Sequence, residues 1–276
     1  MTHSRPTIRE LLDSASLAPR RDLGQNFVAD PNTVRRIAEL ADVGEHDHVV
    51  EIGAGLGSLT LALADTGADI IAIEVDRGVV PILREVVAER ANVRVVEADA
   101  MLLDWDQLLA GHDDWVLVAN LPYNVATPLI CDLLDQVPAI SRMLVMVQRE
   151  AAERFAAAPR TAAYGAVSVK TAYWGTAKIV GHVPASVFVP KPNVESALVA
   201  ITRRDPPATD PATLFSLVRA GFGQRRKMLR RSLANIVAPE TYDAAGISPT
   251  ARPEELDVEA WCRLADAHLA AGAASS

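Results

Sequence analysis

Apolar and polar positions change in blocks along the middle of the chain. Short runs rich in β-branched residues predict strands, and segments with helical spacing separate them. Uninterrupted apolar strands that alternate with helices are typical of a parallel sheet covered on both faces, so the pattern predicts an α/β fold. The strands are expected at 48–52, 69–74, 92–97, 115–120 and 142–148, and the helices at 58–65, 77–90 and 125–136.

Two further apolar runs, 177–183 and 196–203, are joined by a proline-rich loop that has no helix of its own. Without a crossover helix these strands are expected to pair antiparallel, which gives a seven-stranded sheet. Segment 203–211, RRDPPATDP, has the composition of a linker, and only helical patterns follow it. The sequence therefore predicts a sheet domain over residues 1–204 and a small all-helical domain over residues 205–276.

Two helices are expected before the first strand. The stretch TIRE predicts a capping box in which Thr7 caps a helix and Glu10 reaches back to it. Asp30 and Pro31 predict the start of a second helix, which runs to about Ala41. Asp is a favoured cap, and Pro suits the first helical turn.

Composition narrows the class of protein. A chain of 276 residues that is 50% hydrophobic and 22% charged is long enough for one large core or for a core with a satellite domain. Cys131 and Cys262 have no Cys or His at ligand spacing, so neither a disulfide framework nor a metal site is expected. The sequence offers no apolar stretch of about 18 residues and no apolar leader, which predicts a soluble, cytoplasmic protein without membrane contact.

The stretch EIGAGLGSLT at 51–60 places glycines at 53, 55 and 57, where the first sheet strand turns into a helix. Glycine allows a sharp turn and a close approach to a ligand, and the helix N-terminus adds free N–H groups. The third glycine comes one residue earlier than in pyrophosphate-binding loops. The spacing therefore favours a cofactor without phosphate groups, and a tight turn with no ligand is the alternative.

Carboxylates end the next two strands. Glu74 can accept hydrogen bonds from a ribose diol, and Asp99 can accept one from an adenine amine. Each alone is more typical of an ordinary strand end or helix cap. Together at the carboxyl ends of consecutive strands they predict a nucleoside site.

The stretch ANLPYNVATPL at 119–129 ends a buried strand with an amide, a stiff backbone and a ring. Pro122 fixes its own φ and pushes Leu121 towards an extended conformation, which holds the Asn120 amide, the Leu121 carbonyl and the Tyr123 ring in a fixed array. Two acceptors and a ring suit a flat base with an exocyclic amine. The alternative is a plain strand exit in which Asn120 caps a helix.

A basic cluster, GQRRKMLRR, spans residues 223–231, although the net charge is −8. On a helix most of these cations would share one face and could follow a phosphate backbone, with Arg20 and Arg21 as a second contact. A solvated helix face is the alternative. The candidate RNA-binding residues are Arg225, Arg226, Lys227, Arg230 and Arg231.

Several of these motifs together resemble the ribosomal RNA adenine dimethyltransferase family. They are EIGAGLGSLT, NLPYNVATPL, QREAAERF, AYGAVSV and VFVPKPNVESALV, and the similarity runs from GQNF to QRRKMLRRSL. The resemblance implies a Rossmann-like class I methyltransferase domain followed by a small helical domain. It also implies an enzyme that uses S-adenosyl-L-methionine to dimethylate N6 of two adjacent adenosines near the 3′ end of small-subunit (16S) ribosomal RNA.

The resemblance also implies roles for single residues. Asn26 and Val28 would contact the methionine part of the cofactor, while Gly53, Glu74 and Asp99 would hold its backbone, ribose and adenine. Asn120 would touch cofactor and target, with Leu121 and Tyr123 beside it, and Phe188 would supply a second aromatic face for the target adenine. Ala54 and Asn193–Glu195 depart from the commonest family pattern without affecting these roles.

Three other functions stay open at this point. They are a resistance-type methyltransferase of large-subunit RNA, a DNA adenine methyltransferase, and a non-catalytic assembly or nucleic-acid-binding factor. The expected partner is small-subunit ribosomal RNA in a pre-ribosomal particle, bound by a monomer that needs no metal.

Overall fold

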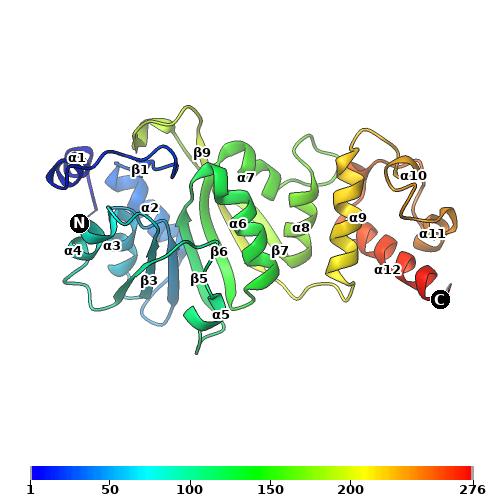
Figure 1. Cartoon of the computed structure of the whole chain (residues 1–276), viewed down its shortest axis with the longest axis horizontal. Coiled ribbons are helices and arrows are strands. Elements are labelled where there is room, and N and C mark those ends of the chain that lie inside the picture. Colours follow the sequence, from blue (N-terminus) through cyan, green and yellow to red (C-terminus); the bar gives the residue numbers. More distant parts are fainter. Residues whose placement is uncertain (1, 275–276) are drawn as a thin grey trace. The chain divides into compact units, whose positions relative to one another are not determined.

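The structure is a computed structural model that describes residues 2–274 (Figure 1). The chain divides into two compact units. Unit 1 holds the residues up to Ala152 together with Lys178–Arg203. Unit 2 holds Glu153–Ala177 together with the residues from Arg204 on. The division made from the sequence has a single cut after residue 204, whereas unit 2 also takes in residues 153–177.

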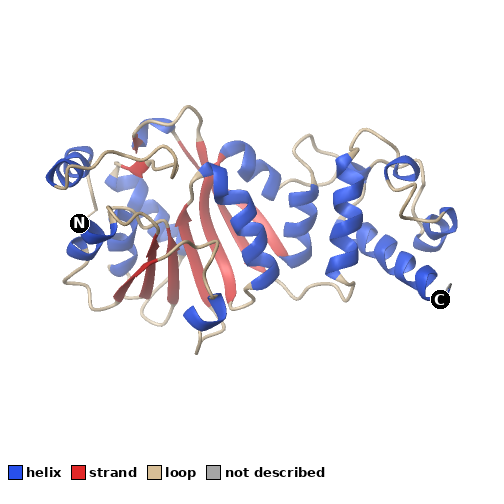
Figure 2. Cartoon of the chain, in the orientation of Figure 1, coloured by secondary structure: helices blue, strands red, loops and turns tan. Residues whose placement is uncertain are grey.

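Unit 1 is built on a seven-stranded sheet in the order β4-β3-β2-β5-β6-β9-β7, shown in red in Figure 2. Strands β4, β3, β2, β5 and β6 run parallel, and β9 pairs antiparallel with β6, so the predicted α/β fold is confirmed. The predicted neighbours β7 and β9 do lie side by side. The strands are β2 (His48–Ile52), β3 (Asp69–Glu74), β4 (Val93–Glu97), β5 (Trp115–Asn120), β6 (Ile140–Gln148), β7 (Gly175–Val183) and β9 (Ser196–Arg203).

Helices cover the sheet, and their cores are aliphatic. Val116 and Val118 of β5 join one buried cluster with residues of α2 and α3, while the alternating Leu117 points to the opposite face. Figure 1 shows α6 lying in front of the sheet. The helices of this part are α1 (Arg5–Ser14), α2 (Pro31–Ala41), α3 (Ser58–Ala64), α4 (Val80–Val86), α5 (Trp105–Leu108) and α6 (Tyr123–Gln136). Helix α7 (Arg149–Phe155) begins in unit 1 and ends in unit 2.

Proline decides where several of these helices begin. The start predicted at Thr7 is wrong, because Pro6 occupies the first turn and Ser4 is the cap, whose side chain accepts from the Thr7 N–H. The start predicted at Asp30 is confirmed, since Asp30 accepts from the Thr33 N–H at 2.9 Å. Helix α4 is shorter than the predicted 77–90 and begins at Val80, which places Pro81 in its first turn.

A second, two-stranded sheet joins distant segments of unit 1. Strand β1 (Phe27–Val28) pairs antiparallel with β8 (Phe188–Val189), which follows a short 3-10 helix, η1 (Ala185–Val187). The Ala29 N–H also donates to the Val187 carbonyl at 2.7 Å. The GQNF and VFVPKP motifs are thereby brought together.

Unit 2 is helical and has a core rich in aromatic residues. Tyr164, Tyr173, Tyr242 and Trp261 are all almost fully buried in it. Tyr164 donates to the Leu256 carbonyl at 2.8 Å, so the segment around residue 164 packs with helices far later in the chain. The elements are α8 (Ala166–Trp174), α9 (Pro211–Gly223), α10 (Leu229–Ser232), α11 (Pro239–Ala245), η2 (Pro253–Glu255) and α12 (Val258–Ala274). Within residues 2–274 no helix has the length and apolar character needed to cross a bilayer.

Candidate active site

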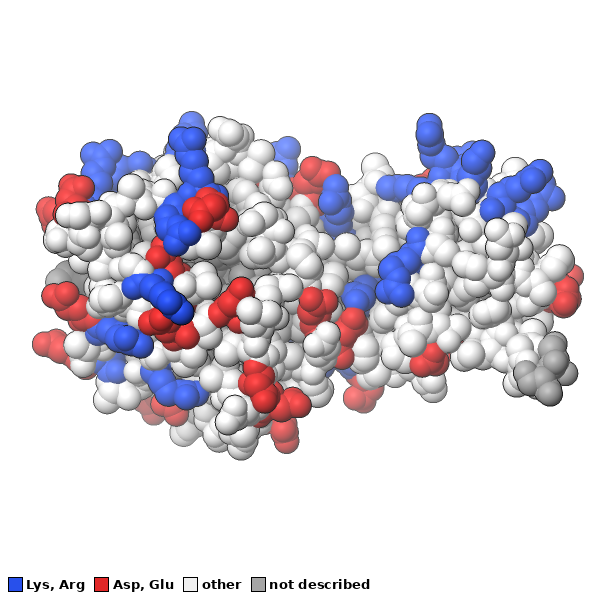
Figure 3. Space-filling view, in the orientation of Figure 1, with Lys and Arg blue, Asp and Glu red and all other residues white. Residues whose placement is uncertain are grey.

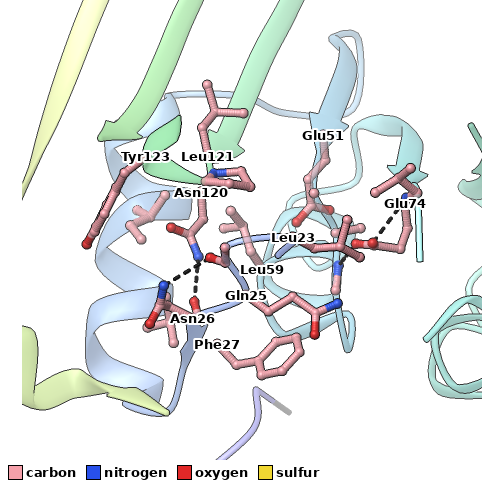
Figure 4. A pocket seen from close by; sticks show the side chains of 18 of the residues that line it. Leu23, Gln25, Asn26, Phe27, Glu51, Leu59, Glu74, Asn120, Leu121 and Tyr123 are labelled. Atoms are coloured by element: carbon pink, nitrogen blue, oxygen red, sulfur yellow. Dashed lines mark hydrogen bonds between the residues drawn. The ribbon is translucent and has the colours of Figure 1, made fainter. Parts of the chain in front are cut away.

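The turn between β2 and α3 has a backbone that glycine adopts readily. Gly53, Gly55 and Gly57 have φ angles of 75°, 55° and 83°, all in the left-handed region. A Cβ atom on Gly55 would come within 3.1 Å of the Phe27 ring. The predicted sharp turn at the end of β2 is therefore present, and it lines the pocket drawn in Figure 4.

Glu74, the last residue of β3, is 6% exposed and accepts three backbone hydrogen bonds. Its Oε2 accepts from the Gly55 N–H at 2.7 Å, and its Oε1 accepts from the N–H groups of Val75 and Asp76 at 3.0 and 2.9 Å. Burial raises the pKa of this carboxyl group, and the backbone donors act in the opposite direction. Glu74 therefore shapes the glycine-rich turn as well as lining the pocket.

Asp99 follows β4 and lines a second hollow beside the first. Its Oδ1 accepts from the Met101 N–H at 2.9 Å, and the residue is exposed. The two hollows share the lining residues Leu23, Gly53, Val75, Leu121 and Pro122, so they form one continuous depression. Glu74 and Asp99 thus lie along the same depression at the carboxyl ends of neighbouring strands.

Asn120, the last residue of β5, is held by a hydrogen bond that fixes its amide. Its Nδ2 donates to the main-chain oxygen of Asn26 at 3.1 Å (Figure 4). Because a carbonyl oxygen only accepts, the amide must present its NH₂ group there, and Oδ1 is the end left for another donor. Asn26 donates in turn to the Gly24 carbonyl at 2.9 Å. A Cβ atom on Gly24 would come within 2.9 Å of Pro122, so the GQNF segment lies directly against Asn120–Tyr123.

Tyr123 lines the same side of the pocket and begins α6. Its hydroxyl oxygen lies 2.7 Å from Oγ of Ser196, and burial raises the pKa of the phenol. Leu121 is buried, and its N–H donates to the Met146 carbonyl at 3.1 Å. Hydrogen bonds therefore hold both the backbone of Leu121 and the side chain of Tyr123.

Most of the predicted site residues meet in this depression, and Phe188 does not. Asn26, Val28, Gly53, Glu74, Asp99, Asn120, Leu121 and Tyr123 all line it. Phe188 is 1% exposed and packs in the aliphatic core with Val28 and Val34. A stacking role for Phe188 therefore stays a prediction that needs the ring to leave this core.

Glu51, directly before the glycine-rich turn, is a candidate that the sequence analysis missed. It is 1% exposed, and its Oε2 has no hydrogen-bond partner within the described residues. Figure 4 shows its carboxyl group directed into the pocket. Burial, with the nearby Glu74 as a smaller cause, raises the pKa of Glu51 to about 8. A buried carboxyl oxygen without a partner is costly, so the geometry favours a ligand that brings a donor to Oε2.

Two further side chains support the pocket, His3 from behind the glycine-rich turn and Gln25 from its lining. Nε2 of His3 lies 2.8 Å from the Leu56 carbonyl in the glycine-rich turn, and burial lowers the pKa of this imidazole. Gln25 donates from Nε2 to Asp76 Oδ2 at 2.7 Å, next to Glu74. No local sequence pattern indicates either contact, because each joins segments more than fifty residues apart.

The basic cluster does not form the continuous helix expected of it. Helix α9 ends at Gly223 and the short α10 begins at Leu229, so the residues between them form a turn. Gly223 and Gln224 interrupt the helix before the cations begin. Arg225 is held within unit 2, where it donates to Glu254 at 2.6 Å and to the carbonyls of Thr161 and Ala162. Arg226, Lys227, Arg230 and Arg231 are exposed, and Figure 3 shows Lys and Arg side chains gathered near α10.

Comparison with known proteins decides the family. The sequence model described as "Ribosomal RNA adenine dimethylase" matches residues 17–268. The chain belongs to the ribosomal RNA adenine dimethylase family. It is 46% identical to the ribosomal RNA small subunit methyltransferase A of Cutibacterium acnes, over 98% of this chain and 95% of that protein. The protein of the same name from Bifidobacterium adolescentis is 44% identical, over 94% of this chain and 92% of that one.

Solved structures of related proteins have the same fold as this ribosomal RNA adenine dimethylase. The 23S rRNA methyltransferase ErmE is 28% identical with a TM-score of 0.66, over 88% of this chain and 99% of that one. A dimethyladenosine transferase from Plasmodium falciparum aligns with a TM-score of 0.73 at 23% identity, over 85% of this chain and 94% of that one. The seven-stranded class I methyltransferase fold is therefore confirmed. Among residues 2–274, no group of three or more His, Cys, Asp or Glu is arranged to hold a metal ion.

Proposed function

We propose that this protein dimethylates N6 of two adjacent adenosines near the 3′ end of small-subunit ribosomal RNA, with S-adenosyl-L-methionine as the methyl donor. The observation that carries the chemistry is the fixed amide of Asn120, whose Oδ1 faces the pocket as an acceptor. The target class is supported by relatives at 44–46% identity that are named small-subunit methyltransferases.

The residues present fit the proposed cofactor. The left-handed glycines leave room for close approach, and Glu51 offers a buried acceptor that has no partner within the described residues. Three of the about four acceptor positions of the Glu74 carboxylate are taken by backbone N–H groups, which leaves one for a ribose hydroxyl, and Asp99 lies further along the depression. When bound, the sulfonium supplies an electrophilic methyl group, so the protein needs to position the nucleophile.

Asn120 and Tyr123 would do that positioning. The amine on adenine is a weak nucleophile because its lone pair is delocalised into the ring. Asn120 Oδ1 and the Leu121 carbonyl would accept its hydrogens and favour the pyramidal form, whose lone pair is free to attack. Tyr123 would lie against the base and stabilise the cationic amine that precedes proton loss. Alignment of this kind accounts for many orders of magnitude in rate.

The RNA would be held in part by the exposed cations of unit 2. Arg226, Lys227, Arg230 and Arg231 are the candidates, whereas the internal bonds of Arg225 favour a structural role for it. Such contacts to phosphates carry affinity rather than sequence choice.

Methylation of large-subunit RNA is the second candidate function. It is favoured by the likeness to ErmE at 28% identity, which is lower than the likeness to the small-subunit enzymes. One experiment separates the two. The protein and an Asn120→Ala control are incubated with undermethylated small or large ribosomal subunits, and modified adenines are mapped by mass spectrometry. We expect two dimethylated adenosines in small-subunit RNA alone, formed about 10²-fold or more slowly with the control.

Product in the large subunit alone would overturn the proposed target. A non-catalytic assembly factor would give no product with either subunit. Calorimetric titration with S-adenosyl-L-methionine then identifies whether the cofactor site itself works.

A further inference from the structure

Ser196 is the buried partner of a residue in the proposed target site. Its Oγ lies 2.7 Å from the hydroxyl oxygen of Tyr123, and the residue is 0% exposed. Tyr123 is partly exposed and lines the pocket beside Asn120. The VFVPKPNVES stretch therefore contributes a polar contact to the pocket, although its Phe188 is buried elsewhere.

The position of the Ser196 hydroxyl is set by the sheet. Ser196 begins β9 and pairs with Gln148 of β6, and the neighbouring Glu195 carbonyl accepts from the Arg149 N–H at 3.0 Å. A residue paired in the β6–β9 ladder has little freedom to move, so its hydroxyl is a rigid anchor. The hydrogen bond to Tyr123 transfers that rigidity to a side chain on another element.

Tyr123 needs such an anchor because of where it stands. It is the first residue of α6, after a Pro122 cap that makes no side-chain capping bond. A tyrosine has two rotatable bonds, and Tyr123 lines the pocket. Its phenol oxygen lies on the axis of the second rotation, so the hydrogen bond to Ser196 fixes the direction of the side chain, while packing sets the plane of the ring. The direction of the ring is then set before a base arrives, which lowers the ordering cost of binding.

We propose that Ser196 is a positioning residue that fixes the Tyr123 ring as a wall of the target-base site. This inference rests on the proposed function, because it assigns Tyr123 to the base rather than to the cofactor. It makes a specific claim about coupling. Ser196 and the Tyr123 hydroxyl should influence the reaction only through their shared hydrogen bond.

A double-mutant cycle tests the claim on the full chain. Ser196→Ala and Tyr123→Phe each remove the same bond from opposite sides and leave the ring in place. Each is expected to lower kcat/KM for undermethylated small subunits by about 3- to 10-fold, the range for loss of one hydrogen bond. The kcat/KM of the double variant should equal that of the more impaired single variant. The calorimetric Kd for S-adenosyl-L-methionine should stay at the wild-type value.

Ser141→Ala is the matched control, since Ser141 Oγ also donates a hydrogen bond in this sheet, to the Trp115 carbonyl at the other end of β5. It should leave kcat/KM unchanged even if Tm falls. If Ser196→Ala fails to fold, Tyr123→Phe still tests the bond, and wild-type kinetics for it overturn the proposal.

Two results with folded variants also overturn the inference: losses in kcat/KM that multiply in the double variant, or a change in cofactor Kd. A wild-type protein that transfers no methyl to small subunits overturns the proposed function and this inference together. An active wild type with an uncoupled pair overturns the inference alone.

Discussion

The two sides of the pocket are held in different ways. On the glycine-loop side, Glu74 takes its three hydrogen bonds from backbone N–H groups of Gly55, Val75 and Asp76. On the β5 side, Asn120 and Tyr123 are held by Asn26 and Ser196, which lie far from them along the chain. The bonds to Glu74 span 19 residues or fewer, whereas those to Asn120 and Tyr123 span 94 and 73 residues. We expect the glycine-loop side to govern cofactor binding and the β5 side to govern methyl transfer.

The largest effect is expected on the β5 side. Asn120→Ala removes an acceptor whose bond to the amine would strengthen as N6 becomes pyramidal, so turnover should fall by about 10² or more. Mono- and dimethyladenosine are measured over time by mass spectrometry at saturating cofactor. Circular dichroism of the variant controls for folding. A folded Asn120→Ala protein with normal turnover would refute the division between the two sides.

The next effect is expected on the glycine-loop side. Glu74→Ala should weaken cofactor binding by about 2 to 3 kcal/mol, the range for charge-assisted hydrogen bonds. The bond to Gly55 means that the turn itself is also disturbed, so Glu74→Gln, which keeps an acceptor, should lose less. Calorimetry gives both affinities. Glu97→Gln is the control, because Glu97 pairs with Glu74 in the sheet register but is exposed. Equal affinities in all three variants would remove Glu74 from the cofactor site.

A smaller effect should come from unit 2 and spare both sides of the pocket. Replacing Arg226, Lys227 and Arg230 by Ala should weaken RNA binding by about tenfold or more and flatten its log-log salt slope by roughly two to three units. Filter binding over a range of salt measures both. Arg225→Ala is the contrasting variant, and it should lower Tm because it breaks the bond to Glu254. If the salt slope of the triple variant equals that of the wild type, these cations only face solvent.

The smallest effect concerns Glu51 and depends on pH. The pKa of Glu51 is about 8 in the folded state and about 4.5 in the unfolded state. Between these two pH values the folded protein keeps a proton on Glu51 that the unfolded protein has lost. That contribution to stability is fully present below about pH 4.5 and is lost as the pH rises through 8. Glu51→Gln should therefore be more stable than the wild type at pH 9 by about 1 to 2 kcal/mol, and about equal to it at low pH. Thermal melts without cofactor at several pH values measure this.

Glu89→Gln, at an exposed position of the same unit, is the control for that series. A wild-type melting profile that matches the Glu51→Gln profile from pH 6 to pH 9 would show that Glu51 does not take up the proton.

The contrast between local and distant contacts also explains what could be predicted from the sequence. The β-branched runs predicted β2, β3, β5 and β9 with their observed bounds, because a strand buried within a sheet appears as a run of consecutive apolar residues. Gly53, Glu74, Asp99 and Asn120 could be placed at one sheet edge for the same reason. The Asn26–Asn120 and Tyr123–Ser196 bonds could not be predicted, since they depend on how separate segments pack.

The errors have local causes as well. The basic cluster was expected on one helix because i, i+3 and i+4 spacing describes helix faces, yet Gly223 and Gln224 end α9 before the cations begin. The single cut after residue 204 missed Tyr164 and Tyr173, whose aromatic rings belong to the core of unit 2. An aromatic residue in sequence does not indicate which of two cores it will enter.

The pairing of β1 with β8 has a consequence for the order in which a newly made chain matures. During synthesis Phe27 and Val28 leave the ribosome long before Phe188 and Val189, so β1 waits without its partner strand. Residues 48–120 are complete much earlier, and the glycine-rich turn can bond to Glu74 as soon as they have emerged. The side of the pocket that carries Asn26 and Tyr123 is therefore finished last. A chain interrupted before Ser196 therefore lacks both the partner strand of β1 and the hydroxyl that holds Tyr123.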